Sequence, residues 1–522
     1  MSRKTDRKQV VIIGAGPGGL ANVMLMAKAG CDVTVLERQD RVGGRTTTIG
    51  GNGFRFDLGA TFFLYPEIIR ELFGMCGRSL DEEVELLRLD PHYRLVYASG
   101  GDLSVTPDVA RMEREIARLS PEDAPNLRPY LEDNRAKLDE FRPVLQTAFN
   151  SWRDFFRLPL MRLLPLMRPW SSVDRDLANF FQDPRVRLAF SFQSKYLGMS
   201  PFQCPSLFTI LAFLEYEFGV FHPRGGCGAV PRAMARVATD LGARIHLNEP
   251  VEEILFDGRR AVGVRTANGF YPCDALIVNA DFAGTMTRLV PDTLRRRWSD
   301  RKLAKKKYSC STYMMYLGLE GECDLDHHTI FLPEDYESNM EDISKRHVLS
   351  EDPSFYIANP ARTDATMAPP GHSSLYVLVP VTHQHPNVDW AQERARFRNL
   401  VLRKLEGTGI RNIRERIRFE KVVTPSDWES GLHVYKGATF NLAHSIDQML
   451  HLRPRNRFED LDGVYLVGGG THPGSGLPVI FESARITGRL IAEDLDLEAA
   501  WEPVSEELPS SAADLVPARL AS

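Results

Sequence analysis

The sequence predicts an α/β protein in which a Rossmann-like domain with a βαβ unit is interleaved with an α+β domain. Three observations support this class. A strand, a glycine-rich turn, a helix and a second strand follow one another near the N-terminus. A strand runs into glycines again at residues 463–470, and the composition changes between these two regions. With 522 residues the chain exceeds one ordinary hydrophobic core, so we expect at least two domains.

The first unit carries the pattern of a dinucleotide site. The apolar strand 10–13 ends in Gly-x-Gly-x-x-Gly, the helix 20–29 follows, and the second strand, 32–36, ends at Glu37. The glycines allow a tight turn close to a pyrophosphate, the helix N-terminus faces the phosphate charge, and the acid accepts hydrogen bonds from a ribose. The predicted contacts are Gly14, Ala15, Gly16, Pro17, Gly18, Gly19 and Glu37.

The residues after Glu37 favour a flavin over NAD. A glycine pair brings the backbone close to the nucleotide, and the arginine after it can reach phosphate. A solvated charged turn is the alternative here. Further on, the hairpin strand 53–61 ends in small residues that leave room for an isoalloxazine ring, although an ordinary glycine turn fits that stretch equally well. The predicted contacts are Arg38, Gly43, Gly44, Arg45, Thr46, Gly59, Ala60 and Thr61.

Charge and cysteine content exclude several classes of protein. The 64 basic and 69 acidic residues give a net charge of −5, which does not suit a nucleic-acid binder. The seven cysteines are scattered and contain no C-x-x-C pair, so we expect reduced thiols in a cytosolic protein and no metal site. The basic N-terminus leads into a strand instead of a signal peptide, and no uncharged segment is long enough to span a bilayer.

Between residues 86 and 222 we expect a first part of the substrate domain. Strands are predicted within 86–97 and at 103–105, and helices at 107–119 and 121–145, the second starting at Ser120 to Asp123. Residues 206–221 are dense in Phe, Leu, Ile and Tyr. They predict a core helix, which could also line a long apolar pocket.

The segment 151–170 combines large apolar residues with Arg153, Arg157, Arg162 and Arg168. Such a segment can lie in a membrane interface with its arginines at anionic headgroups. Pro159 and Pro165 argue against one straight helix. The alternative is a pair of short core helices whose arginines extend toward solvent. We favour the membrane surface.

The cofactor domain and the substrate domain alternate along the rest of the chain. The strands 262–266 and 275–280 are expected in one layer, 313–319, 355–357 and 375–381 in a substrate sheet, and 390–405 as a helix. The histidines at 327, 328, 383 and 385 read as solvated or core residues. We expect the cofactor domain to consist of residues 1–85, 223–301 and 456–497. The substrate domain is expected at 86–222 and 302–455, and a disordered tail at 498–522.

The C-terminal part of the cofactor domain pairs a glycine-rich turn with a helix that begins near Pro478 and continues to about Leu495. The N-terminus of this helix can place its amides and the positive end of its dipole at the flavin. The predicted contacts are Gly469, Gly470, Gly476, Leu477, Pro478 and Val479.

Together these motifs resemble the bacterial and fungal phytoene desaturase family, with its diapophytoene (C30) desaturases and carotenoid oxidases. The resemblance rests on residues 11–19, 41–45, 218–226, 440–442, 453–456 and 465–478. Gly-Thr-His-Pro-Gly-x-Gly-x-Pro from Gly470 is the most specific part, because amine oxidases lack it. The resemblance implies an architecture like that of amine oxidases and phytoene desaturases, FAD as the cofactor, and an adenine contact at Val251.

The same resemblance implies dehydrogenation of a hydrophobic polyene precursor such as phytoene or diapophytoene, with hydride transfer to the flavin and oxygen or a quinone as the electron acceptor. The enzyme would act in the cytoplasm, at the inner face of the membrane. Phe218 stands where many phytoene desaturases have tryptophan, and the helix 480–486 carries more charge than expected for C40 enzymes, so the substrate length stays open.

The sequence identifies no catalytic residue. His472 and Glu482 lie on the element expected beside the flavin, where capping or pairing explains them better than catalysis. Three other functions remain open. A terminal-methyl carotenoid oxidase and a carotene isomerase would use the same scaffold. A flavin-free prenyl-binding protein on the fold of Rab GDP-dissociation inhibitors belongs to a different class.

Overall fold

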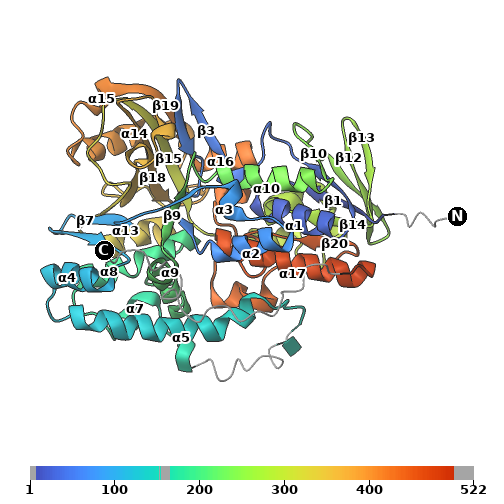
Figure 1. Ribbon diagram of the computed structural model, residues 1–522, viewed down its shortest axis with the longest axis horizontal. Helices are drawn as coiled ribbons and strands as arrows, with labels where there is room; N and C mark the ends of the chain where they lie inside the picture. The colour runs from blue at the N-terminus through green and yellow to red at the C-terminus, as the bar shows by residue number, and fades with distance from the viewer. Residues whose placement is uncertain (1–6, 152, 155–164, 499–522) are drawn as a thin grey trace, which may run out of the picture.

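A parallel sheet holds the N-terminal βαβ unit in the computed structural model, which describes residues 7–151, 153–154 and 165–498 (Figure 1). Its strands, in order across the sheet, are β10 (Arg244–His246), β2 (Asp32–Leu36), β1 (Gln9–Ile13), β14 (Ala275–Val278) and β20 (Val464–Leu466). All pairs are parallel. Strands more than 450 positions apart in the chain therefore share one sheet.

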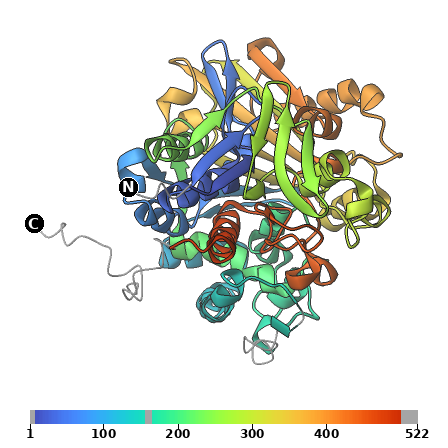
Figure 2. The same ribbon diagram turned by 90° about the vertical axis from the view of Figure 1, so that its right-hand side faces the viewer.

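The two faces of this sheet are covered by different layers. On one face Val10 and Ile12 share a core with helices α1 (Pro17–Lys28), α10 (Ala229–Asp240) and α17 (Leu477–Leu495). On the other face Val11 and Ile13 meet residues of a three-stranded antiparallel sheet. Its strands are β11 (Glu253–Asp257), β12 (Arg260–Thr266) and β13 (Gly269–Pro272), and Figure 2 shows them beside the parallel strands. Burial on both faces explains why β1 is apolar at consecutive positions.

The prediction that residues 262–266 share a layer with 275–280 is wrong. Residues 275–278 form β14 of the parallel sheet, whereas 262–266 belong to β12, the middle strand between β11 and β13 in a separate sheet. Both stretches read as apolar strands, and their separation depends on pairing partners that a strand pattern does not reveal.

A larger mixed sheet forms the second part of the molecule. Its strands, in order, are β19 (Ile417–Val423), β15 (Ser311–Glu320), β18 (His372–Val381), β17 (Phe355–Ala358), β16 (His328–Leu332), β7 (Tyr93–Tyr97) and β8 (Asp102–Val105). The described pairs are antiparallel except β16 with β7. The strands predicted at 313–319, 355–357, 375–381 and 103–105 all lie in this sheet.

Helices cover both parts of the large sheet. Helix α14 (Trp390–Glu406) packs on β15 and β18. A helical layer, at the bottom of Figure 1, packs against β7 and β16. The helices of that region are α4 (Val109–Leu119), α5 (Leu127–Leu145), α7 (Val173–Leu177), α8 (Pro184–Ala189), α9 (Ile210–Phe218) and α13 (Tyr336–Glu341).

The remaining helices and strands are short. They are the hairpin β3 (Thr48–Gly51) and β4 (Phe54–Asp57), the sheet of β5 (Phe63–Leu64), β9 (Val220–Pro223) and β6 (Leu86–Arg88), and helices α2 (Glu67–Met75), α3 (Leu80–Glu83), α11 (Phe282–Leu289), α12 (Asp300–Ala304), α15 (Ile413–Arg416) and α16 (Pro425–Leu432). Within the described ranges no helix is both long enough and apolar enough to cross a bilayer.

Two predicted helix boundaries are wrong, each for a local reason. α5 begins at Leu127 instead of near Ser120, because the Asp123 carboxylate accepts hydrogen bonds from the amides of Gln182 (2.7 Å) and Asp183 (2.8 Å). The helix predicted to Phe221 ends at Phe218, where Gly219 takes a φ of +87° and the chain turns into β9.

Candidate functional site

The first glycine loop adopts a conformation that only glycine fits at two positions. Gly14 has a φ of +95°, and its amide donates to the carbonyl of Leu36 at 2.9 Å. At Gly19 a Cβ would lie 2.3 Å from the Gly14 carbonyl oxygen and 2.6 Å from Asn279 Nδ2. Glycine therefore allows the loop, α1 and the end of β14 to approach one another.

Asn279 holds this loop from a distant part of the chain. Its side-chain amide donates to the carbonyls of Gly14 (3.0 Å) and Gly16 (3.3 Å). Asn279 belongs to the predicted strand 275–280 but is not among the predicted cofactor contacts. Its position at the end of a buried parallel strand is the signal that could have identified it.

The N-terminus of α1 is open to an anion. Gly16 caps the helix with no side-chain hydrogen bond, Pro17 occupies the first turn, and that turn contains no acid. The first amides of an α-helix lack partners within the helix, and they lie at the positive end of its dipole. A phosphate group fits both properties.

Glu37 lies where the dinucleotide pattern requires an acid. Its Oε2 accepts a hydrogen bond from the amide of Ala15 (2.7 Å), and its Oε1 accepts one from the amide of Gln39 (2.9 Å). The Glu37 carbonyl accepts from the amide of Glu249 at 2.8 Å, so the loop that leads to Val251 passes beside this acid. Glu37 and the half-buried Val251 therefore lie on neighbouring segments.

The glycine pair joins the first loop directly. The Gly43 amide donates to the Ala15 carbonyl at 2.8 Å, and a Cβ on Gly44 would lie 3.5 Å from Gly16 Cα. The next residues close a turn in which the buried Thr46 donates its amide to the Gly43 carbonyl at 2.8 Å. The two glycine motifs thus form one continuous surface.

Two arginines lie behind these loops. Burial lowers the pKa of Arg45, with Asp281 opposing the shift, and its guanidinium donates to the carbonyl of Thr439. Burial and the like charge of Arg288 lower the pKa of the half-buried Arg38. Both residues adjoin predicted contacts in the sequence, Arg38 following Glu37 and Arg45 following Gly44.

Residues 59–61 face the large sheet. The Gly59 carbonyl accepts a hydrogen bond from Tyr376 at 2.7 Å, and a Cβ on Gly59 would lie 2.7 Å from the Arg45 carbonyl oxygen. Thr61 Oγ1 accepts a hydrogen bond from Tyr356 at 2.9 Å. Ala60 lies between them and is half-buried. The hairpin end is therefore fixed between Arg45 and the tyrosines of the second sheet.

The C-terminal glycine loop meets the first one. A Cβ on Gly18 would lie 3.0 Å from Ile480 Cγ2 and 3.0 Å from Val467 Cγ2. Gly476 caps α17 without a side-chain hydrogen bond, and Leu477 and Pro478 start the helix, followed by Val479. The open N-termini of α1 and α17 therefore belong to the same region.

A fully buried arginine supports the second loop. Arg453 donates to the carbonyls of Leu442 (3.2 Å), Gly469 (2.7 Å) and Thr471 (3.1 Å), and burial lowers its pKa to about 9. A Cβ on Gly470 would lie 2.7 Å from Phe282 Cβ. The motif 453–456 contributed to the resemblance, but nothing in the sequence gives Arg453 this bracing role.

The two titratable residues considered near the flavin have structural partners. His472 hydrogen-bonds the Thr147 carbonyl at 3.0 Å, and burial lowers its pKa to about 4. Burial raises the pKa of Glu482, which accepts from Gln146 (3.1 Å) and pairs with Arg485 (3.3 Å). These partners are a backbone carbonyl, an amide and an arginine, as expected for side chains that cap a segment or form a pair within the protein.

His327 and His328, at the start of β16, are buried. Burial lowers the pKa of His327 and His328 well below 6.5. His328 Nδ1 lies 2.6 Å from the Tyr356 hydroxyl, which also reaches Thr61. Within the described ranges no group of three or more histidine, cysteine, aspartate or glutamate side chains could hold a metal ion.

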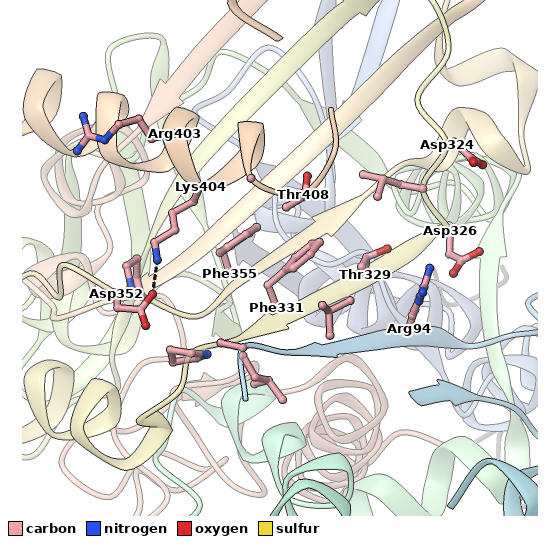
Figure 3. A pocket seen from close by; sticks show the side chains of 17 residues that line it. Arg94, Asp324, Asp326, Thr329, Phe331, Asp352, Phe355, Arg403, Lys404 and Thr408 are labelled. Carbon is pink, nitrogen blue, oxygen red and sulfur yellow. Dashed lines mark hydrogen bonds and ion pairs between the residues drawn. The ribbon is translucent and has the colours of Figure 1, made fainter. Parts of the chain in front are cut away.

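A cavity of about 560 Å³ lies elsewhere, between α14 and the strands β7, β16 and β17 (Figure 3). Phe331 and Phe355 form part of its lining, Lys404 pairs with Asp352 at one side, and Arg94 lies at the other. None of the predicted flavin contacts lines it. This cavity is therefore separate from the glycine loops.

The glycine loops satisfy the requirements of a dinucleotide. They combine two open helix N-termini, an acid at the end of β2, and glycines whose Cβ atoms would meet backbone. The residues able to hold such a group come from α1, β2 and the loop after it, the loop before β11, and the start of α17.

Comparison with known proteins agrees with this geometry. The sequence profile of the family described as "Flavin containing amine oxidoreductase" matches residues 18–495. A 4,4'-diapophytoene desaturase (4,4'-diapolycopene-forming) from Methylomonas sp is 42% identical over 490 residues, covering 94% of this chain and 96% of that protein. An all-trans-zeta-carotene desaturase from Myxococcus xanthus is 40% identical over 508 residues, covering 95% of each.

A solved structure shares the fold. An oxidoreductase from Methanosarcina mazei superposes with a TM-score of 0.56 and covers 93% of this chain and 100% of its own, at 18% sequence identity. Such a low identity supports the architecture alone. The predicted α/β class, with its Rossmann-like domain and second domain, is confirmed.

Proposed function

This chain belongs to the family of flavin-containing amine oxidoreductases and is an FAD-dependent oxidoreductase, and from that premise we propose that it desaturates a long-chain isoprenoid carotenoid precursor such as phytoene or diapophytoene. One observation carries the proposal: 42% identity, over 94% of the chain, to a protein named as a diapophytoene desaturase. The family assignment excludes the flavin-free prenyl-binding protein that the sequence left open.

We propose that the glycine loops hold the FAD. The pyrophosphate would lie at the N-terminus of α1, the ribose at Glu37, the adenine at Val251, and the ring between residues 59–61 and the start of α17. Bound FAD supplies a two-electron acceptor that takes a hydride from an allylic carbon of the substrate. The protein's part is to orient the polyene and to keep water away.

The product identifies the reaction and the substrate length. Cells that supply either a C30 or a C40 precursor would express the enzyme, and the pigments would be analysed by mass and visible absorption. Desaturation removes two hydrogens per new double bond, oxidation adds oxygen, and isomerisation leaves the mass unchanged. Gly19→Val serves as the flavin-deficient control. Pigment of unchanged mass, or with added oxygen only, would refute desaturation.

We further propose that the enzyme works at the cytoplasmic face of a membrane, where its polyene substrate dissolves. In the segment 151–170, for which the sequence predicted membrane contact, residues 152 and 155–164 lie outside the described residues. Arg168, one of its described arginines, pairs with Asp133 and Asp176, both at 2.6 Å, and therefore does not serve a headgroup in the way the sequence suggested. The proposal rests instead on apolar side chains.

Three exposed apolar side chains support membrane contact. Trp170 is 71% exposed, Ile446 55% and Leu452 37%. Met167 and Met449, close to them in the chain, pack against one small core, so the two segments are neighbours. Each side chain buried in an interface contributes about 1.5–3 kcal/mol.

Vesicle flotation tests this contact. With vesicles of phosphatidylcholine and phosphatidylglycerol, Trp170→Ser combined with Ile446→Ser should weaken binding at least about tenfold. Phe270→Ser on β13, where Phe270 is 51% exposed, is the matched control and should bind like the wild type. Polar replacement of Phe155, Phe156, Leu163 and Leu164 probes the remaining segment. Unchanged binding in all these variants would refute the membrane proposal.

We propose oxygen or a quinone as the electron acceptor. Anaerobic turnover restored by a soluble quinone would identify the quinone, whereas turnover in air alone would identify oxygen. Failure of both to regenerate activity would refute this choice of acceptors.

A further inference from the structure

Glu215 on α9 is a carboxylate held by neutral hydrogen-bond donors. Its side chain is fully buried. Oε2 accepts hydrogen bonds from the Tyr93 hydroxyl (2.7 Å) and from Gln193 Nε2 (3.2 Å), and Oε1 accepts one from the Tyr196 hydroxyl (2.8 Å). No lysine or arginine of the described ranges forms an ion pair with it. A buried acid without a cation is costly, so its presence calls for an explanation.

This cluster borders the segment proposed to face the flavin. The Tyr196 ring lies 5.4 Å from the ring of Phe62, which directly follows Thr61. The Phe62 ring also lies 5.5 Å from that of Tyr356, whose hydroxyl donates to Thr61 Oγ1 at 2.9 Å. Tyr196, Phe62 and Tyr356 are each only partly buried, so they present accessible surface beside this segment.

A second contact joins the cluster to the C-terminal glycine loop. Tyr196 belongs to the 3₁₀ helix Phe192–Leu197, which ends at Gly198 with a φ of +66°. A Cβ on Gly198 would lie 2.6 Å from the ring of Phe440, and the Phe440 carbonyl accepts a hydrogen bond from Ser475 Oγ at 2.7 Å. The segment that carries Tyr196 therefore packs against Phe440, which in turn hydrogen-bonds the C-terminal glycine loop.

Building on the proposed desaturation, we infer that Tyr196 and Glu215 accept the proton that leaves the substrate. Bound FAD would accept the hydride, which leaves the substrate with both electrons of its C–H bond, and the substrate would be left as an allylic cation. A C–H bond on the neighbouring carbon then breaks, and its electron pair forms the new double bond. The proton passes to the Tyr196 oxygen while the Tyr196 hydroxyl proton moves to Glu215. Tyr196 is the catalytic residue, and Glu215 acts through it as a positioning residue.

The surroundings suit this transfer. The aromatic rings of Phe62 and Tyr356 can stabilise a transient positive charge through their π faces, and the Glu215 carboxylate, which forms no ion pair with any described lysine or arginine, adds a negative charge. No described base other than Glu215 hydrogen-bonds the Tyr196 hydroxyl. This pair therefore offers a defined proton acceptor beside the rings of Phe62 and Tyr356.

The pKa of Glu215 suits a group that accepts a proton near neutral pH. Burial raises the pKa of Glu215 to about 7, although its three hydrogen bonds oppose the shift. The titratable groups that face it are Tyr93 from β7, Tyr196, Tyr130 from α5 and Tyr216 from α9, and burial raises the pKa of each well above 10. Glu215 is thus the group of this cluster that changes charge near neutral pH, where proton transfer is most efficient.

Two conservative variants and one control test the inference. Glu215→Gln and Tyr196→Phe keep side-chain size and should retain bound FAD, yet each should slow desaturation about 100-fold or more. In the wild type the rate should rise with pH through about 7, and in Glu215→Gln this rise should disappear. Tyr93→Phe, the control, leaves the Tyr196 contact in place. This variant should stay active. Its rate should rise at a higher pH than in the wild type, because the loss of one hydrogen bond to the carboxylate raises the pKa of Glu215.

A second readout does not depend on turnover. Infrared difference spectra recorded between pH 5 and pH 9 should show a protonated carboxyl band that disappears near pH 7 in the wild type and is absent in Glu215→Gln. Wild-type rates and pH profile in flavin-loaded Glu215→Gln or Tyr196→Phe would overturn the inference and leave the proposed desaturation intact. Lack of any desaturated product from the wild type would instead refute the proposed function.

Discussion

Gly19 shows how one absent side chain controls a whole loop. A Cβ there would meet the carbonyl oxygen of Gly14, a backbone atom that cannot move without opening the turn. At Gly74, on α2, an added Cβ would meet no atom within 4 Å. The two glycines therefore differ in the space around them although both lie in helices.

Gly19→Val should lose its flavin. The displaced loop can no longer approach a pyrophosphate, so we expect FAD affinity to fall at least about tenfold, seen as loss of flavin absorbance after desalting. Gly74→Ala should keep wild-type flavin content and gain up to about 1 kcal/mol of stability. Full flavin content in Gly19→Val would contradict the placement of the cofactor.

Glu215 should make the stability of the protein pH-dependent. Burial raises its pKa from 4.5 to about 7, so the folded state binds the proton more tightly than the unfolded chain. The resulting stability is fully present below pH 4.5 and is lost as the pH rises through 7. Between pH 4.5 and pH 8 the wild type should lose about 3 kcal/mol more than Glu215→Gln, measured by urea unfolding at both pH values. Equal losses would show that the carboxyl group is not desolvated.

At the scale of elements, one buried lysine ties α5 to α7 and to the turn before α9. Lys137 Nζ lies 2.9 Å from Asp133, 2.9 Å from Asp176 and 3.0 Å from Thr209 Oγ1. Arg168 pairs with the same two acids. The helical layer therefore depends on a compensated group of charges in addition to its apolar core.

Lys137→Ala should destabilise the protein by about 3 kcal/mol, because it leaves the buried Asp176 and the half-buried Asp133 with one cation fewer. The matched control is Lys345→Ala, which removes an exposed lysine that also pairs with an acid four residues earlier, Glu341. That change should cost less than about 1 kcal/mol. Denaturant unfolding of both variants measures the difference, and equal effects would mean that the Lys137 cluster is not desolvated.

At the scale of the whole molecule, the cofactor region joins distant parts of the chain. The strands of the parallel sheet come from residues 9 to 466, and the two open helix N-termini belong to α1 and α17. A ligand that contacts all of these parts stabilises the folded state as a unit.

FAD should therefore raise the midpoint of thermal unfolding of the flavin-depleted protein. At 100 times its dissociation constant the expected stabilisation is about 2.7 kcal/mol. Riboflavin, which lacks the pyrophosphate and adenosine, should stabilise less because it cannot contact the α1 N-terminus or Glu37. Equal stabilisation by both ligands would mean that the pyrophosphate and adenosine do not bind at the glycine loops.

Whether a residue of the site could be predicted from the sequence depends on how far along the chain its partners lie. The glycine loops could be recognised because each motif lies within about 30 consecutive residues and its chemistry depends on local backbone shape. Arg453 and Asn279 were not among the predicted contacts, since their roles depend on carbonyls supplied by separate segments. The separate sheet of β12 was missed for a similar reason, because strand patterns do not specify the pairing partner.

The sequence by itself determined the α/β class, the βαβ unit, the flavin cofactor and the family, since these depend on short-range patterns of glycine, apolar and acidic residues. Only the tertiary structure decided that Tyr93, Tyr196 and Gln193 converge on Glu215. It likewise decided that Arg168 pairs within the protein. The physical reason is that hydrogen bonds and ion pairs between distant segments form only when packing brings those segments together, and no local periodicity encodes which segments will meet.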